Sequence, residues 1–310
     1  EQYIYIYKAL INALTLDCEA IPIESFQEYV DTTNNNVYSR QFQQLKQVVE
    51  TGRKDDLETY TLNEKQTDKN RHGADIPCGR FAVMLYLSRE DEGLGYINAV
   101  YVNSFKKKDY FIVAQSPLPN TVSDFICMLY QEDCSCIVTM DDLKQHGMAV
   151  GQYLPEDKQT LSFGHFTVSC SRLETKHHYT AKKMKIRFNG KFASGEKVAY
   201  HFQYSKWMAM DETPVNAKEF VEFVNDVDEY ASQLGEERSH VLVHCLKSNE
   251  RSGLFCAVAI LMEKMKLERQ VSVLNTLTHL RTRRRSAITS MEQLKFCYQA
   301  VSAYIKLNKQ

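Results

Sequence analysis

The sequence lacks an excess of either sign of charge and lacks long apolar runs. Its 310 residues include 38 lysines and arginines and 39 aspartates and glutamates, which gives a formal net charge of -1. A protein that binds nucleic acid mainly through electrostatics has a clear basic excess, so this class is excluded. No run of 18 or more apolar residues occurs, and we expect neither a membrane-spanning helix nor a signal peptide in this segment.

The sequence also lacks cysteine pairs at metal-binding spacing. None of the nine cysteines belongs to a CxxC pair, and Cys134 and Cys136 have no matching cysteine or histidine pair at the spacing of a zinc site. Adjacent residues of a strand point to opposite faces, so His177 and His178 indicate a turn rather than a metal site. We expect no metal and no cofactor. Nine free thiols are typical of a reducing, intracellular compartment.

The composition is that of a globular domain, because 44% of the residues are hydrophobic and 25% are charged. Short β-rich runs predict strands in residues 81–87, 96–102, 110–114, 136–140, 163–173, 179–188, 198–204 and 241–245. Apolar residues at helical spacing predict helices in residues 1–16, 38–51, 120–131, 220–234, 253–265, 271–281 and 291–305. This order predicts an α+β (α/β-like) fold, a highly twisted mixed β-sheet flanked by helices.

Several local patterns predict caps, turns and loops. Ser25, with Glu28 three residues later, indicates a helix cap. Residues 62–70 are polar and predict a solvated loop. The basic cluster at residues 281–285 is also interpreted as a solvated loop, in preference to a nucleic-acid or lipid head-group site. Residues 106–109 and 189–190 predict turns between strands.

The two ends of the chain resemble each other. Residues 1–10 are identical to residues 292–301 at four of ten positions, with an offset of 291 residues that nearly equals a whole domain. Such a match predicts that residues 1–16 are the last helix of a preceding copy of the domain. Residues 17–24 are then a linker, and residues 25–310 form the domain itself.

Residues 241–253 carry the clearest chemical signal. An apolar strand ends at Cys245, and Arg251, Ser252, a glycine and a long helix follow. This order is typical of a phosphate cradle, in which loop amides and a helix N-terminus converge on an anion. There the Cys245 thiolate is stabilised and its pKa is expected below that of a free thiol, while Arg251 binds two phosphate oxygens. The alternative of a structural cysteine beside an unrelated arginine stays open on spacing alone.

The stretch from His244 to Gly253 resembles the signature loop of the protein tyrosine phosphatases. Five other stretches resemble segments of the same family, in the same order along the chain. They are the phosphotyrosine-recognition loop (residues 69–76), the Tyr-Ile-Asn-Ala strand (95–102), the Pro-Leu-Pro-Asn segment (114–125), the strand before the acid loop (201–207) and the glutamine loop (280–293). The resemblance implies the phosphatase fold. With the repeated terminal helix, it also implies the membrane-distal domain of a receptor-type phosphatase, preceded by the end of a membrane-proximal one.

The family needs a cysteine nucleophile, a phosphate-binding arginine, a general acid and a glutamine that positions water. The resemblance assigns the first two roles to Cys245 and Arg251, with Ser252 donating a hydrogen bond to the thiolate. It assigns substrate binding to Lys247, Asn249 and Arg71.

The sequence departs from the family at the residues that perform its chemistry. Ala209 stands where the acid loop has its aspartate, and Asp211, two residues on, replaces it only if the loop has shifted. Loss of a general acid typically costs ~10²–10⁴-fold in rate. The other altered positions are Ser248 and Glu250 for loop glycines, His72 for the tyrosine of the recognition loop, and Thr289 for the first glutamine of the glutamine loop, in which Gln293 is retained.

These departures predict an inactive or strongly impaired phosphatase domain, a pseudophosphatase with a regulatory or scaffolding role. Glu250 is expected to repel phosphate or to pair with Arg251. Two alternatives stay open: a weak or specialised tyrosine-phosphate hydrolase that uses Cys245, Arg251 and Asp211, and a redox sensor in which Cys245 is oxidised.

The resemblance also implies partners and a location. The expected partners are the adjacent membrane-proximal phosphatase domain, in the same or another chain, and cytoplasmic signalling proteins, including phosphotyrosine proteins. No nucleic acid is expected to bind. The expected location is the cytoplasmic face of the plasma membrane, as the intracellular part of a single-pass receptor, with membrane contact only through that receptor.

Overall fold

The computed structural model describes residues 18–51, 57–77, 79–87, 95–143, 149–191, 193–234 and 239–308, together with Tyr3. The helix expected at residues 1–16 lies, apart from Tyr3, outside these residues, and the division at residues 16 and 24 stays a prediction. Within the expected linker, β1 (Ile21–Pro22) pairs with β11 (Gln270–Val271). None of the helices in the described parts of the chain is long and apolar enough to cross a membrane.

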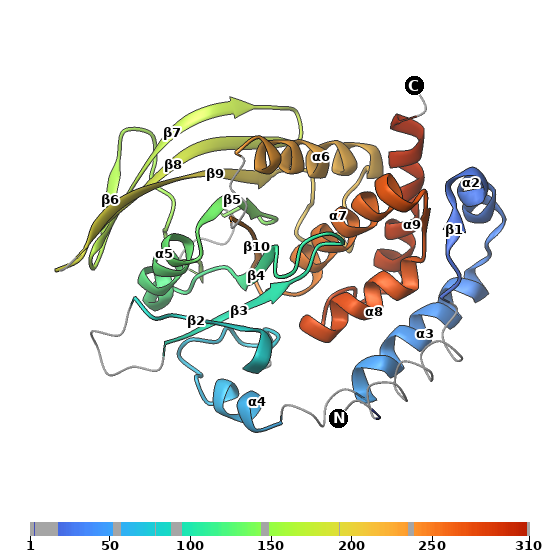
Figure 1. Ribbon diagram of the computed structural model, residues 1–310, viewed down its shortest axis with the longest axis horizontal. Helices are drawn as coiled ribbons and strands as arrows, with labels where there is room; N and C mark the ends of the chain where they lie inside the picture. The colour runs from blue at the N-terminus through green and yellow to red at the C-terminus, as the bar shows by residue number, and fades with distance from the viewer. Residues whose placement is uncertain are drawn as a thin grey trace.

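The described residues form a mixed sheet of nine strands in the order β2-β3-β4-β10-β5-β9-β8-β7-β6 (Figure 1). The strands are β2 (Ala82–Met84), β3 (Tyr96–Val102), β4 (Phe111–Gln115), β5 (Cys134–Thr139), β6 (Thr160–Phe163), β7 (Phe166–Thr175), β8 (Tyr179–Asn189), β9 (Ser194–Tyr204) and β10 (His240–Cys245). The central strands β4, β10, β5 and β9 are parallel, and the outer pairs are antiparallel. The carboxyl ends of the parallel strands therefore meet at one edge of the sheet, where ligands bind in open α/β sheets.

Helices cover both faces of the sheet (Figure 1). They are α2 (Ile23–Thr32), α3 (Asn35–Thr51), α4 (Leu57–Glu64), α5 (Val122–Gln131), α6 (Ala217–Gln233), α7 (Glu250–Glu268), α8 (Val273–Arg283) and α9 (Met291–Leu307), with short 3-10 helices η2 (Gly79–Phe81) and η3 (Pro119–Thr121). Helix α5 packs in one hydrophobic core, while α6, α7, α8 and α9 pack in the other. Helix α7 is apolar around most of its surface because it is buried among its neighbours. The predicted fold class is confirmed.

Two local predictions are wrong. Ser25 lies inside α2, whose N-cap is Pro22, and the Ser25 hydroxyl donates to the Pro22 carbonyl at 3.4 Å. Residues 62–64 form the last turn of α4 rather than a loop. The turn at His177–His178 is confirmed, because the Lys176 amide donates to the Tyr179 carbonyl between β7 and β8.

The basic cluster at residues 281–285 is not simply a solvated loop. The Arg284 side chain is 1% exposed and donates to the Asp75 carbonyl at 2.9 Å, the Asn98 side chain at 2.8 Å and the Val113 carbonyl at 3.0 Å. Arg281 is also buried and donates to the Leu45 carbonyl, and burial lowers its pKa to about 10. Charge pattern alone does not reveal burial, and here the arginines tie a loop and a helix to the sheet.

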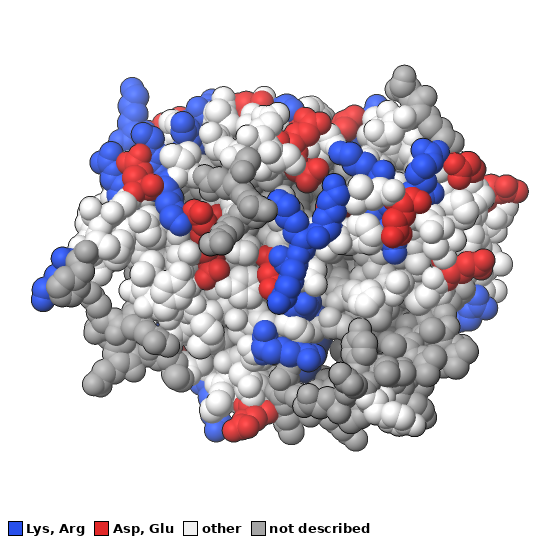
Figure 2. Space-filling model, viewed as in Figure 1, with Lys and Arg blue, Asp and Glu red and all other residues white. Residues whose placement is uncertain are grey.

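The surface carries both signs of charge. On the face shown in Figure 2, acidic and basic side chains are interspersed, with a column of basic side chains over the centre. No single sign covers this face, which agrees with the near-zero net charge.

Replacing Arg284 with methionine is expected to lower the free energy of unfolding by about 3 kcal/mol, because buried acceptors lose a charged donor. Urea unfolding of the two proteins measures the difference. The control is Arg269→Met, which removes an exposed ion pair with Glu24 at 3.0 Å and is expected to cost less than about 1 kcal/mol. Equal losses in the two variants would show that Arg284 is not an anchor.

Candidate active site

The candidate site lies between the end of β10 and the start of α7, at the carboxyl edge of the parallel strands. Cys245 is the last residue of β10, and Glu250 is the first residue of α7. Asn249 is the N-cap of that helix, and its side chain accepts a hydrogen bond from the Glu250 amide at 2.8 Å. Gly253 packs closely, since a Cβ there would lie 2.8 Å from the Ala287 Cβ. Asn249 therefore serves the helix in this structure, rather than facing a substrate.

The Cys245 thiol is buried, with 3% of the residue exposed. Its Sγ lies 3.0 Å from the Ser252 hydroxyl, as the sequence predicted. The pKa of the thiol is raised, mainly by burial and to a lesser extent by the Asp141 carboxylate. Hydrogen bonds from the Ser252 hydroxyl and from the amides of Ser252 and Asn249 act to lower it. The expectation of a lowered pKa is therefore wrong, because desolvation outweighs the hydrogen bonds. A raised pKa argues against the redox alternative, which depends on a low-pKa thiol.

Arg251 is held by the protein itself. One terminal nitrogen donates to the carbonyls of Met140 at 3.2 Å and Trp207 at 3.1 Å, and the other donates to the Met208 carbonyl at 2.6 Å. The same guanidinium lies 3.3 Å from a carboxylate oxygen of Asp141 and 4.9 Å from the centre of the Trp207 ring. Both terminal nitrogens of Arg251 thus already donate to acceptors within the chain.

Glu250 is not the residue that pairs with Arg251. Its exposed side chain lies at the first position of α7, where a carboxylate interacts favourably with the helix dipole. Among the described residues, the Glu250 carboxylate has no hydrogen bond or ion pair. Of the two alternatives expected for Glu250, pairing with Arg251 is therefore wrong, because Asp141 pairs with Arg251 instead; repulsion of phosphate by Glu250 stays a prediction.

Asp141 is a site residue that sequence reasoning missed. It is buried two residues beyond the end of β5, and one carboxylate oxygen accepts a hydrogen bond from the Leu246 amide while the other faces Arg251. The same carboxylate therefore engages a loop amide and an arginine, the two kinds of donor that hold a phosphate. In the sequence, its only signal is an acidic residue just after an expected strand. The structure adds that this strand is a parallel neighbour of β10.

The loop between Cys245 and Glu250 forms a hydrogen bond within itself. The Ser248 amide donates to the Cys245 carbonyl at 3.1 Å, so this amide does not face an outside ligand. Ser248 is fully buried with φ +58, a backbone conformation that glycine adopts at lower cost, and its hydroxyl has no hydrogen-bond partner among the residues that the structure describes. The serine at this position therefore fills the interior of the loop.

The acid loop presents no carboxylate to the cysteine. The Trp207 indole donates to the Asp211 carbonyl at 2.9 Å, and the Asp211 amide donates to the Met208 carbonyl at 3.2 Å, which closes the loop as a turn. Ala209 and Asp211 are both exposed in that turn. Within the described part of the chain, the Asp211 carboxylate makes no hydrogen bond or ion pair. The structure does not bring Asp211 together with Cys245 and Arg251.

Gln293 has a structural position. Its side-chain oxygen accepts from the Thr289 amide at 2.8 Å, and its side-chain nitrogen donates to the Glu212 carbonyl at 3.1 Å. Its own amide donates to the hydroxyl of Ser290, the N-cap of α9. The retained glutamine thus joins the start of α9 to the acid loop. The oxygen and the nitrogen of its side-chain amide both already have hydrogen-bond partners.

The recognition loop is anchored to the sheet, but its arginine is not available for a substrate. The Arg71 guanidinium donates to the carbonyls of Ala149 at 2.8 Å and Ser116 at 3.1 Å. His72 is exposed. Lys247 is exposed too. Its terminal nitrogen lies close to Gly73, 3.6 Å from the point where a Cβ would stand if residue 73 had a side chain. Of the three predicted substrate-binding residues, only Lys247 has its side chain exposed beside this loop.

A buried polar chain supports the strands behind Cys245. The Ser116 hydroxyl lies 2.9 Å from His244 Nδ1, and the Tyr153 hydroxyl lies 2.8 Å from both His244 Nε2 and His201 Nε2. Burial lowers the pKa of His201 to about 3 and the pKa of His244 well below its usual value, so both rings are neutral. These four side chains come from separate segments of the sequence, so no sequence motif predicted their hydrogen bonds.

Iodoacetamide should alkylate Cys245 slowly at neutral pH, because the raised pKa leaves little thiolate. Asp141→Asn is expected to shift the rate–pH profile to lower pH, since the Asp141 carboxylate raises the thiol pKa. Mass spectrometry of labelled peptides measures the rate at each pH, and Asp211→Asn is the control expected to leave the profile unchanged. A wild-type midpoint below about 8.5, the value of a free thiol, would contradict this assignment.

Comparison with known proteins shows matches over almost the whole chain. The family model described as protein-tyrosine phosphatase matches residues 66–303. Receptor-type tyrosine-protein phosphatase alpha of Homo sapiens and that of Mus musculus are each 27% identical over 312 residues, which cover 98% of this chain and 38% and 37% of those proteins. Receptor-type tyrosine-protein phosphatase U of Gallus gallus is 28% identical over 316 residues, 99% of this chain and 22% of that protein. The chain spans less than two fifths of the length of these relatives, and it belongs to the protein-tyrosine phosphatase family.

Proposed function

We propose that this chain is a pseudophosphatase domain, an inactive or strongly impaired tyrosine phosphatase domain that regulates or scaffolds an adjacent catalytic domain of a receptor phosphatase. The observation that carries the proposal is the capture of Arg251 by Asp141 and by the carbonyls of Met140, Trp207 and Met208. A phosphate group must displace these acceptors before Arg251 can bind it. It must also approach the buried Asp141 carboxylate, which repels it.

The chemistry beyond binding is impaired as well. The tyrosyl leaving group lacks a proton donor, because Ala209 replaces the acid and Asp211 is exposed without a contact to the cysteine. The raised pKa of Cys245 reduces the nucleophilic thiolate at neutral pH. Gln293 is already bound to Thr289 and Glu212, so its amide is not free to position water. These losses affect separate steps of one reaction.

A binding role is supported by what the acid loop exposes. Met208 is 71% exposed and Met210 is 94% exposed, on a loop whose carbonyls are fixed by Arg251, Trp207 and Gln293. Flexible methionine side chains on a fixed backbone suit an apolar contact with a protein partner. The proposed partners are the membrane-proximal phosphatase domain, in the same or another chain, and cytoplasmic signalling proteins, including phosphotyrosine proteins.

The receptor-type names of the relatives support the proposed setting. In that setting residues 1–16 end a preceding membrane-proximal domain, residues 17–24 link the two, and residues 25–310 form the membrane-distal domain. The domain then lies at the cytoplasmic face of the plasma membrane and contacts the membrane only through its parent receptor.

The chain is expected to hydrolyse a phosphotyrosyl peptide no faster than its Cys245→Ser variant, because nucleophile, acid and phosphate site are all impaired. Release of inorganic phosphate over hours measures this. Hydrolysis by the wild type that disappears in Cys245→Ser would contradict the proposal and favour the weak hydrolase that uses Cys245, Arg251 and Asp211.

The same assay tests whether the impairments are correctly placed. The combination Ala209→Asp, Ser248→Gly, Glu250→Gly, His72→Tyr and Asp141→Asn is expected to raise turnover by at least ~10²-fold, the lower end of general acid catalysis. A matched set without Asp141→Asn should gain less, since Arg251 stays paired. No gain in either set, with folding intact by circular dichroism, would show that the impairment lies elsewhere.

A further inference from the structure

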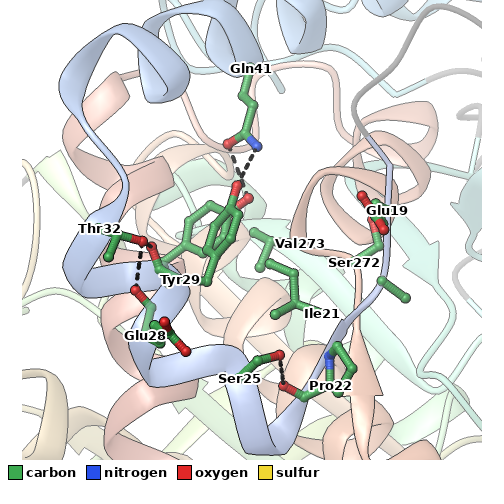
Figure 3. A pocket seen from close by; sticks show the side chains of 12 residues that line it. Glu19, Ile21, Pro22, Ser25, Glu28, Tyr29, Thr32, Gln41, Ser272 and Val273 are labelled. Carbon is green, nitrogen blue, oxygen red and sulfur yellow. Dashed lines mark hydrogen bonds between the residues drawn. The ribbon is translucent and has the colours of Figure 1, made fainter.

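A cavity of about 360 Å³ lies away from the β10–α7 loop, at the side of the domain formed by β1, α2, α3, the start of α8 and the middle of α9. Figure 3 shows its walls at close range. Volumes near 300 Å³ are at the lower end for ligand pockets, so this space suits one long side chain rather than a large cofactor. None of the residues described in the active site lines it.

One end of the cavity is a hydrogen-bonded aromatic group. The buried Gln41 side chain donates to the Tyr29 hydroxyl at 3.2 Å and accepts from the Tyr298 hydroxyl at 3.0 Å. The rings of Tyr29 and Tyr298 are stacked, with centroids 5.8 Å apart and an interplanar angle of 24°. These contacts fix the rings, so the aromatic surface exists before any ligand binds.

The rest of the lining is apolar or acidic. Ile21, Pro22 and Val273 supply an apolar wall. Glu19 and Glu28 supply two exposed carboxylates, which lie on opposite sides of the cavity in Figure 3. No lysine, arginine or histidine is among the described residues that line the cavity, so its carboxylates have no cation there. The lining therefore combines negative charge, an aromatic face and an apolar wall.

We propose that this cavity binds a lysine or arginine side chain from a basic segment of a partner protein. The aliphatic stem of such a side chain packs on Ile21, Pro22 and Val273, while its cation lies by the ring of Tyr29, between the carboxylates of Glu19 and Glu28 on the two sides of the cavity. No other common side chain offers both a long apolar stem and a positive charge. This docking site does not depend on the state of the active site and adds a second contact surface to the domain.

The test uses the whole chain and short capped peptides. The probes are Gly-Gly-Arg-Gly-Gly and Gly-Gly-Lys-Gly-Gly, and the matched control has norleucine, an uncharged side chain of similar length, at the centre. Nuclear magnetic resonance titration follows the Glu28 and Tyr29 amides. We expect both basic peptides to shift these signals and to bind at least about 5-fold more tightly than the norleucine peptide. Equal binding of the norleucine peptide, or no shift with either basic peptide, would overturn the proposal.

Variants locate the interaction. Glu19→Gln combined with Glu28→Gln is expected to weaken binding of the arginine peptide roughly 3- to 10-fold, because the cation loses the attraction of two exposed carboxylates. Glu24→Gln is the control, since Glu24 lies on the same helix but pairs with Arg269 and does not line the cavity. Loss of binding in the control, or none in the double variant, would refute the site. Tighter binding of spermidine than of either peptide would show that a free amine, not a protein segment, is the ligand.

Discussion

The guanidinium of Arg251 and the carboxylate of Asp141 form the interaction on which the rest of the site depends. Arg251 lies in the first turn of α7, and Asp141 follows β5. The carbonyls that accept from Arg251 belong to the acid loop and to Met140. One side chain thus joins three elements of the sheet edge. An incoming anion must compete with the Asp141 carboxylate and with these carbonyls for the guanidinium, so the closed arrangement resists it.

The contacts that hold the fold together do not depend on the chemistry that we propose to be impaired. Arg284 holds a loop to the centre of the sheet, and the chain from Ser116 through His244 and Tyr153 to His201 fixes the strands behind Cys245. None of these contacts needs a phosphate group or a general acid. Gln293 and Arg251 have become fixed points for the acid loop, whose exposed methionines face outward. In the proposed function, these two residues thereby support a contact surface.

The sequence predicted the sheet, most helices and the position of Cys245, Arg251 and Ser252, because apolar periodicity and one local motif determine them. It did not predict Asp141, whose role depends on β5 lying parallel beside β10, and strand order cannot be read from local pattern. The pKa of Cys245 was predicted in the wrong direction, since the motif shows the hydrogen-bond donors but not the burial or the nearby carboxylate. The burial of Arg281 and Arg284 was missed for the same reason, because charge pattern does not report the acceptors that a fold brings together.

Binding of a phosphotyrosyl peptide, measured by isothermal titration calorimetry, tests most directly whether Asp141 keeps Arg251 from phosphate. The account predicts no detectable binding to the wild-type chain at millimolar peptide and a gain of at least about 10-fold in affinity for Asp141→Asn, because the variant loses a competing and repelling carboxylate. Asp211→Asn, which alters an exposed carboxylate of the acid loop, should leave the affinity unchanged. Micromolar binding by the wild type that Asp141→Asn does not strengthen would contradict the account.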